Sequence, residues 1–423
     1  MKTYSFMCFI LTALMGIGLS CSTKPASDIE QLYPGSFEIS VENATTLARL
    51  DQAVMLNVDR IREKHPVFNP QAFVVLSGEE ELPAQAVDRN VDGEFDQIVV
   101  LADFAPQEVK RLTVRFASSG KIQRDYRKRT QAELSHKVGG RFVNGKYEGG
   151  EFQNVDYLRV PPEHTDHSEF IRYEGPGWES DKVGYRFYLD WRNAIDIFGK
   201  KTPEMVLHTV GLDGFDSYHK MADWGMDILK VGESLGIGSI GMWFEGKAQR
   251  VAVMDSVTCR IMADGPLYSQ IRTQYFGWEV GGKKYDLTSD LSIAAGSRLT
   301  RHEAQTTGTP PNLCTGIVKH SEAKLLTPTQ EENGWTYLAT YGKQSLAEDN
   351  LGMAILFKAT DLIEIQEDSQ SHVVVLRPSE GKLEYYFLAA WEKEPGGIQN
   401  ESQFVQYLKE MIAVLDSPLS VRF

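Results

Sequence analysis

The stretch Glu279-Val280-Gly281-Gly282-Lys283-Lys284-Tyr285 decides the fold class of this 423-residue chain. Two adjacent glycines between strand-like segments predict a two-residue β-hairpin turn, because glycine readily adopts the positive φ angles that such a turn needs. Apolar segments at 268–276 and 291–293 lie on either side of the turn and predict two paired strands. Further short apolar runs predict the other strands of a large β unit, at 185–189, 353–357, 373–376 and 385–390.

Ahead of this unit, residues 36–118 predict a separate β-sandwich. Apolar and polar residues alternate over 37–41 and over 112–116, which is the pattern of a strand with one buried face. A basic stretch follows at 119–130 and predicts a solvated linker. The larger unit then extends over 131–423, so the predicted fold is mainly β, with two units of unequal size.

One amphipathic helix is predicted near the C-terminus, and it is the clearest helical pattern in the chain. Phe404, Leu408, Met411 and Leu415 recur at helical spacing. Ser402 precedes them and is available to cap the helix.

The first residues predict export from the cytoplasm. Lys2 precedes an apolar run that is too short to span a bilayer, as in a secretory signal peptide over 1–20. Gly18-Leu19-Ser20-Cys21 resembles a bacterial lipoprotein cleavage box and predicts lipidation of Cys21, with 21–35 as a tether. The expected location is the periplasm or the outer-membrane surface, with the lipid anchor as the only membrane contact. A plain signal peptide cleaved near Cys21 is the alternative.

The composition excludes several classes of protein. Lys and Arg total 44 against 58 Asp and Glu, which gives a formal net charge of −14 and argues against nucleic acid as a partner. Hydrophobic residues make up 42% of the chain and charged residues 24%, which excludes global disorder. Cys259 and Cys314 are interpreted as buried, inert thiols, with one disulfide between them as the alternative.

A loop in the predicted sandwich has the spacing of a calcium site. Asp88, Asn90 and Asp92 stand at positions 1, 3 and 5, with Gly93 next and Asp96 three residues later. Position 12 is a valine, so the bidentate acid of such loops is missing. A structural calcium ion is therefore weighed against a turn in which these side chains bind their own backbone.

Residues 185–192 predict a polar strand face. If the segment is extended, Arg186, Tyr188, Asp190 and Arg192 point to one side and apolar residues to the other. Guanidinium groups bind carboxylates or sulfates through paired hydrogen bonds, so this face is a candidate site for an acidic ligand. An exposed outer face of a sheet is the alternative.

A histidine lies in a second polar segment. His219, Asp223 and Asp227 are spaced four apart and would share one face of a helical turn, where Asp223 would orient His219 as a general base. Tyr218 adds a phenol beside this imidazole. A histidine that is hydrogen-bonded only for structural reasons is the alternative.

Other residues near these segments are candidate ligand contacts. Sugar rings stack on aromatic planes, so Trp178 and Trp224 are predicted to contact substrate, together with Glu179. Most of the seven tryptophans would also suit a β core. His164 and His167 are spaced to bind a metal ion, but the sequence shows no third ligand.

Three stretches resemble the family called domain of unknown function 4861: residues 83–96, 177–186 and 218–227. The resemblance extends from about residue 36 to the end of the chain. It implies a galactose-mutarotase-like β-supersandwich for the larger unit, a fold shared with several polysaccharide lyases. It also implies a secreted or lipid-anchored protein encoded with polysaccharide-degrading enzymes of glycan-utilising bacteria. The family's name assigns no activity, so the resemblance gives context and architecture.

Together these features favour an enzyme that acts on uronic-acid-containing oligosaccharides by β-elimination, as a lyase or dehydratase. Arg186 and Arg192 would neutralise the uronate carboxylate, so that the proton at C5 becomes acidic. His219 would remove that proton, and Tyr188 or Tyr218 would protonate the leaving oxygen. The partner is an acidic oligosaccharide, and no cofactor is required apart from the calcium weighed above.

Two alternatives stay open at this stage. A glycoside hydrolase would need two carboxylates flanking the glycosidic oxygen, drawn from Glu174, Glu179, Asp181 and Asp190. A glycan-binding lipoprotein without catalytic activity would need only the binding residues.

Overall fold

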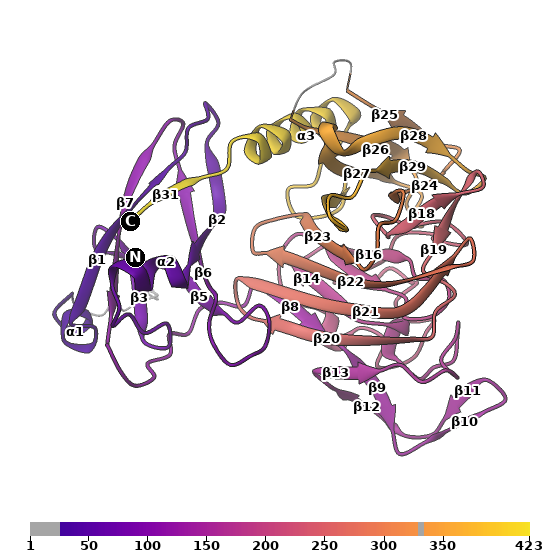
Figure 1. Cartoon of the computed structure of the whole chain (residues 1–423), viewed down its shortest axis with the longest axis horizontal. Coiled ribbons are helices and arrows are strands. Elements are labelled where there is room, and N and C mark those ends of the chain that lie inside the picture. Colours follow the sequence, from indigo (N-terminus) through magenta and orange to yellow (C-terminus); the bar gives the residue numbers. More distant parts are fainter. Residues whose placement is uncertain (1–25, 329–333) are drawn as a thin grey trace, which may run out of the picture.

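A computed structural model describes residues 26–328 and 334–423 (Figure 1). The predicted signal peptide at 1–20 and the predicted lipidation residue Cys21 lie outside the described residues. No helix within the described ranges is long and apolar enough to cross a membrane. The chain forms a small and a large β unit, which stand side by side in Figure 1.

The small unit is the predicted β-sandwich. A five-stranded sheet contains, in spatial order, β31 (Ser420–Arg422), β1 (Gly35–Glu42), β7 (Val109–Phe116), β3 (Phe73–Ser77) and β4 (Glu80–Leu82). A three-stranded sheet contains β2 (Arg49–Asn57), β6 (Gln97–Phe104) and β5 (Ala84–Val87), with helix α2 (Val58–Lys64) after β2. The alternating apolar residues of both sheets, such as Ile39, Val54 and Val114, form one buried core between them.

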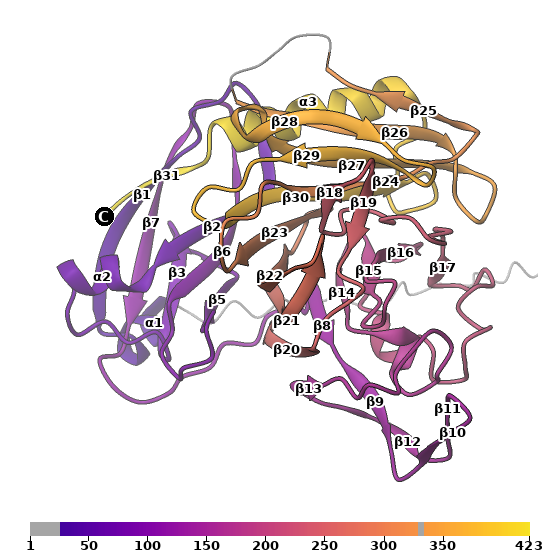
Figure 2. The same cartoon turned by 45° about the vertical axis from the view of Figure 1, so that its right-hand side comes forward.

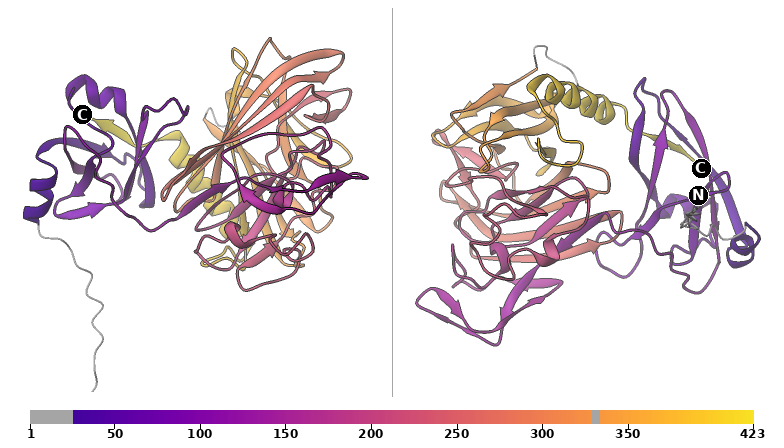
Figure 3. Two further views of the ribbon diagram at one scale, coloured as in Figure 1. Left: turned by 90° about the horizontal axis from the view of Figure 1, so that it is seen from below. Right: turned by 180° about the vertical axis from the view of Figure 1, so that it is seen from behind.

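Both predicted outer boundaries of the units need correction. Helix α1 (Ala26–Leu32) lies within the predicted tether, and Ile29 and Tyr33 pack on the small sandwich instead of standing free. The larger unit does not continue to residue 423, because β31 pairs antiparallel with β1 of the small sandwich. Figures 2 and 3 show the chain leaving helix α3 (Glu401–Asp416) and returning to the small unit.

The basic stretch at 119–130 is largely exposed, as its composition predicts, but it is also bound to both units. Arg124 binds Glu81 of the small sandwich through two hydrogen bonds. Arg129 donates to Asp51 of the small unit and to Asp181 of the large unit. The arginines of this stretch therefore fasten the two units to each other.

The large unit is a β-supersandwich in which one wide sheet faces two smaller ones. The wide sheet contains β13 (Tyr157–Arg159), β20 (Ser256–Asp264), β21 (Tyr268–Val280), β22 (Lys283–Ala294), β23 (Leu299–Thr306), β30 (Lys382–Trp391), β27 (Asn350–Lys358), β26 (Trp335–Lys343) and β25 (Ala323–Leu326). One smaller sheet contains β17 (Gly225–Asp227), β16 (Ile195–Lys200), β15 (Gly184–Phe187), β14 (Gly177–Ser180) and β8 (Thr130–Glu133). The other contains β19 (Lys247–Arg250), β18 (Gly241–Phe244), β24 (Leu313–Val318), β29 (Ser371–Leu376) and β28 (Leu362–Glu367).

The sequence signals for the hairpin and the helix are confirmed, with one difference. Gly281 and Gly282 have φ angles of 58° and 74° and join β21 to β22, so that Val280 pairs with Lys283. Helix α3 buries Phe404, Leu408 and Ile412. Its N-cap is Asn400, which accepts from the backbone N–H of Gln403, and not Ser402.

The core of the large unit accounts for several residues of the sequence analysis. Trp178 stacks on Tyr185 with ring centroids 5.5 Å apart, and Phe387 of the wide sheet packs against both rings. Cys259 and Cys314 are buried, free thiols, as interpreted from the sequence. The sheet that contains β14, β15 and β16 is thereby fixed against the wide sheet, and its polar residues form the site described next.

Candidate functional site

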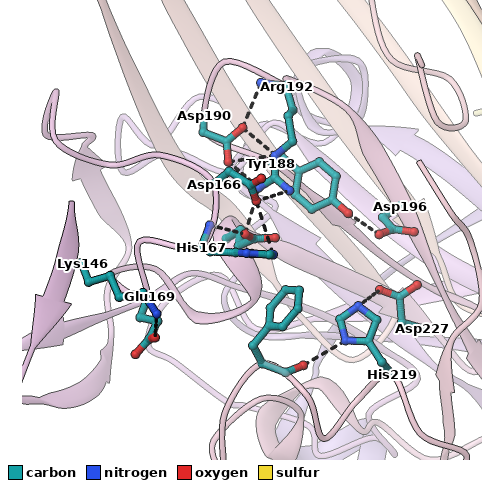
Figure 4. A network of polar contacts seen from close by, with 12 residues as sticks. Lys146, Asp166, His167, Glu169, Tyr188, Asp190, Arg192, Asp196, His219 and Asp227 are labelled. Atoms are coloured by element: carbon teal, nitrogen blue, oxygen red, sulfur yellow. Dashed lines mark hydrogen bonds and ion pairs between the residues drawn. The ribbon is translucent and has the colours of Figure 1, made fainter. Parts of the chain in front are cut away.

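The polar strand predicted at 185–192 is shorter than expected. Strand β15 ends at Phe187, and the chain turns before β16 begins at Ile195. Trp191 consequently lies at the surface with 43% of its area exposed, instead of joining the apolar face. Arg186 nevertheless donates to the phenol oxygen of Tyr188, so both side chains belong to one polar cluster. Figure 4 shows Tyr188 and its neighbours in this cluster from close by.

Arg186 is the hub of this cluster. Its side chain is 2% exposed, and its guanidinium lies 2.8 Å from Asp196 Oδ2 and 2.5 Å from Asp227 Oδ2. Its Nη1 donates to the phenol oxygen of Tyr218 at 3.0 Å. The predicted role of Arg186 in binding a substrate carboxylate is therefore wrong, because three protein groups already take its donors and no solvent reaches it.

Arg192 is also occupied by the protein. Its guanidinium stacks 3.9 Å from the centre of the Tyr188 ring and binds Asp190 through paired hydrogen bonds. It lies 2.9 Å from Glu174 Oε1 and 2.8 Å from Asp166 Oδ1. The predicted substrate contacts Arg192 and Asp190 thus neutralise each other, and neither presents a free charge to a ligand.

Both candidate phenols are buried, but they differ in their contacts. Tyr188 donates to Asp196 Oδ2 at 2.5 Å and does not line the cleft, which argues against the predicted role as an acid towards substrate. Tyr218 lines a cleft, and burial raises the pKa of its phenol above the ordinary value. Tyr218 therefore keeps its proton at neutral pH and remains a candidate general acid.

His219 has a different carboxylate partner from the predicted one. Its segment forms turns and not a helix, so Asp223 is exposed and does not orient the imidazole. The His219 Nδ1 atom lies 2.9 Å from the carbonyl oxygen of Phe215, and Nε2 lies 3.4 Å from Asp227 Oδ2. The side chain is 30% exposed, and burial lowers its pKa below the ordinary value of an imidazole. His219 is therefore neutral at pH 7 and available as a base.

A cleft of about 570 Å³ opens beside this cluster. Tyr218 and Phe215 line one part of its wall, and the His219 ring packs against both of them with centroid distances of 4.6 Å. Lys137 and Lys146 form another part, and both pair with Glu169. His167 and Glu174 also line the cleft. Figure 4 shows Lys146 and Glu169 across from His219 and Asp227.

Three other predicted substrate contacts do not belong to the cleft. Trp178 lies in the core and donates to Thr300 Oγ1. Glu179 pairs with Lys200 at 2.5 Å, and both side chains are completely buried. Trp224 packs on Phe198 with ring centroids 5.9 Å apart. Trp178 and Glu179 are buried, so the prediction that they bind substrate is wrong, whereas Trp224 is partly exposed outside the cleft and its role in binding stays a prediction.

The loop with calcium spacing belongs to the small sandwich. Asp88 accepts backbone N–H groups of Val91 and Gly93, and Asp96 accepts that of Arg89. Asn90 and Asp92 likewise accept from their own loop. This is the turn weighed as the alternative, and the calcium ion stays a prediction.

Several residues of the site have no distinctive signal in the sequence. Asp196 stands alone on a buried strand, and Lys137 and Lys146 lie in an edge segment without a motif. The sequence distinguishes Asp227 only by its spacing from His219. Their importance comes from the pairing of β15 with β16 and of β16 with β17, which places Asp196 and Asp227 next to Arg186.

The fold and the site define a mainly-β supersandwich protein with a buried polar network beside an open cleft. The chain belongs to the family described as Domain of unknown function (DUF4861), whose model matches residues 41–421. This confirms the family resemblance of the sequence.

Comparisons with solved structures and curated proteins add two findings. The chain is similar to a glycosyl hydrolase family 38 protein from Enterococcus faecalis, at a TM-score of 0.45 and 9% identity, covering 92% of this chain and 47% of that one. It is similar to an α-mannosidase from Enterococcus faecalis V583, at a TM-score of 0.45 and 8% identity, covering 92% and 46%. The chain thus spans about half the length of these two proteins. No curated protein matches it.

Proposed function

We propose that this protein is a carbohydrate-active enzyme that acts on uronic-acid-containing oligosaccharides by β-elimination, as a lyase or dehydratase. The observation that carries the proposal is the packing of a neutral imidazole against a protonated phenol whose residue lines the cleft. His219 and Tyr218 have ring centroids 4.6 Å apart, and Tyr218 lines the cleft. A base and an acid at this separation fit removal of a proton and departure of an oxygen from adjacent carbons.

The proposed step balances in protons and bonds. His219 Nε2 takes the proton from C5 of the uronate, the C4–O bond breaks, and a C4–C5 double bond forms. Tyr218 gives its proton to the leaving oxygen, which belongs to a sugar in a lyase or to water in a dehydratase. The proton on His219 then restores the Tyr218 phenol, either directly or through solvent.

The cleft lining contains four carboxylates and two lysines, and the lysines are the groups that would bind an acidic sugar. Arg186 and Arg192 are bound to carboxylates of the protein. The two lysines of the cleft are therefore the groups that would neutralise the uronate carboxylate. Lys146 is 62% exposed and Lys137 is 18% exposed, so both can shift from Glu169 to a ligand carboxylate. Neutralising the carboxylate stabilises the negative charge that develops when C5 loses its proton.

The structure disfavours hydrolysis by the carboxylates that the sequence suggested. Glu179, Asp181 and Asp190 are each buried and bound to a cation. Of the four suggested carboxylates, only Glu174 lines the cleft. A hydrolase needs a second carboxylate on the other side of the scissile bond, and these three cannot provide it.

Product analysis tests the proposal. The purified protein is incubated with saturated oligosaccharides that carry terminal or internal uronates, and the products are analysed by ultraviolet absorbance and mass spectrometry. We expect an unsaturated uronate, together with loss of water or cleavage of the chain. Reducing sugar without an unsaturated product would show hydrolysis instead, and binding without any product would show a glycan-binding protein.

A further inference from the structure

The loop between β13 and β14 gathers three side chains of the kind that bind metal ions. Ligand atoms of Asp166, His167 and Glu174 all lie within 4.8 Å of one another. Figure 4 shows Asp166 and His167 between Arg192 and His219. The sequence had offered His164 and His167 without a third ligand. The structure instead places His164 against Ser168 in the interior and brings Glu174 to His167.

The surroundings of this cluster carry excess negative charge. Two guanidinium groups, those of Arg186 and Arg192, serve five carboxyl groups: Asp166, Glu174, Asp190, Asp196 and Asp227. Carboxylates that share too few cations in a buried place must take up protons or bind a further cation. A divalent ion at the three ligands would supply two of the missing positive charges.

Glu174 provides a second, independent observation. Its side chain is 5% exposed, and Oε2 has no hydrogen-bond donor. Arg186 Nη1 lies 3.7 Å from this oxygen, whereas Oε1 accepts from the backbone N–H of His167 and pairs with Arg192. A buried carboxylate oxygen without a donor is costly, and a bound cation removes that cost.

We propose that Asp166, His167 and Glu174 bind one divalent transition-metal ion of the Mn²⁺ or Zn²⁺ type. Two carboxylate oxygens and one imidazole nitrogen form a mixed ligand set, which favours such ions over Ca²⁺ because Ca²⁺ prefers oxygen ligands alone. Three protein ligands leave coordination positions open. Because His167 and Glu174 line the cleft, these positions face it.

The role of the ion in the reaction rests on the proposed function. An ion at this place would hold the uronate carboxylate opposite His219 and Tyr218, where Arg186 and Arg192 cannot. It would thus supply the charge neutralisation that the sequence assigned to those arginines. Lys137 and Lys146, the lysines of the cleft, would then attract and orient the acidic oligosaccharide.

Metal titration of the full chain tests the site without any substrate. The purified protein is stripped with a chelator, and Mn²⁺ is added in a calorimeter and followed by electron paramagnetic resonance. We expect one saturable Mn²⁺ site per chain, with weaker binding of Ca²⁺. Asp166→Asn and His167→Gln should each weaken Mn²⁺ binding at least ~10-fold, since even groups that only support a ligand change metal affinity by that factor.

The variants are chosen so that folding does not obscure the result. Glu174→Gln removes a partner of two buried guanidiniums and is expected to unfold part of the site, whereas Asp166 and His167 have partly exposed side chains. Asp216→Asn is the matched control, because Asp216 is an exposed carboxylate that lines the same cleft outside the cluster. It should change the Mn²⁺ affinity by less than threefold.

The outcomes separate the metal site from the proposed function. Absence of saturable Mn²⁺ binding, or equal affinity in wild type, Asp166→Asn and His167→Gln, overturns the metal site even if β-elimination is observed. Site-specific Mn²⁺ binding without any unsaturated product supports the metal site and contradicts the proposed function. The His167→Gln variant should also lose the preference for Mn²⁺ over Ca²⁺, because its imidazole nitrogen is gone.

Discussion

At the residue scale, the two nitrogens of the His219 ring have different environments. The carbonyl oxygen of Phe215 can only accept a hydrogen bond, so Nδ1 carries the proton of the neutral ring. The other nitrogen, Nε2, is then the basic atom, and its distance of 3.4 Å to Asp227 exceeds that of a normal hydrogen bond. Nε2 is therefore the atom that would take up a substrate proton.

The pKa of His219 predicts the pH dependence of the reaction. The base works only when neutral, and burial lowers its pKa below the usual value of about 6.5. We therefore expect kcat/KM to rise with pH through a single acidic limb that lies below pH 6.5 and to level off by neutrality. Initial rates of unsaturated-product formation across pH 4–8 measure this limb. A limb centred above pH 7 would contradict the assignment of His219 as the base.

Arg186 predicts a stability effect rather than a binding effect. Replacing it in Arg186→Met leaves Asp196 and Asp227 buried without their guanidinium, which costs about 3–5 kcal/mol of unfolding free energy. Urea denaturation of wild type and variant measures the change. Arg127→Ala is the control, because the Arg127–Glu204 pair is exposed and contributes about 0–1 kcal/mol. Equal stability of Arg186→Met and wild type would show that the hub has another role.

The sequence predicted which of these residues meet but not what they do. The alternation of residues 185–188 correctly put Arg186 and Tyr188 on one side of a strand. That side is buried because Asp196 of β16 and Asp227 of β17 lie against it. Local periodicity contains no information on such partners, so the arginine was assigned to a ligand.

At the scale of secondary-structure elements, the sequence predicted a local turn correctly but did not predict how distant strands pair. The two glycines at 281–282 specify their turn through φ angles that adjacent residues can reveal. By contrast, β15 ends because residues 188–194 turn back, with Tyr188 N–H donating to the carbonyl of Ala194. The apolar residues of that turn continue the strand pattern, so the sequence alone overextended the strand.

Strand β31 predicts that the last residues stabilise the small sandwich. Leu419, Val421 and Phe423 pack against its core, and β31 pairs with β1. Deleting residues 419–423 should lower the unfolding free energy of the small unit by at least ~2 kcal/mol, through lost apolar burial and an uncovered strand edge.

Chemical denaturation followed by small-unit probes measures this effect. Arg422→Ala is the matched control, because its side chain is 78% exposed and should change stability by less than about 0.5 kcal/mol. Unchanged stability after the deletion would contradict a structural role for β31.

At the scale of the whole molecule, the two units are joined at more than one place. Arg129 bridges Asp51 and Asp181, and the C-terminal strand returns to the first sheet. The sequence predicted both β units but treated their junction as a solvated linker, because a run of basic residues does not reveal the carboxylates it meets. The fold class could thus be predicted, whereas the arrangement of units and the cleft depend on contacts between distant residues.

The proposed function requires that His219 act as the base of β-elimination on an acidic oligosaccharide. The most direct measurement compares formation of unsaturated uronate by wild type, His219→Ala and His208→Ala, where His208 is an exposed histidine of the neighbouring segment. We expect His219→Ala to lower the rate by ~10²-fold or more and His208→Ala to stay near wild type. Near-normal elimination by His219→Ala, or no unsaturated product from the wild-type protein, would contradict it.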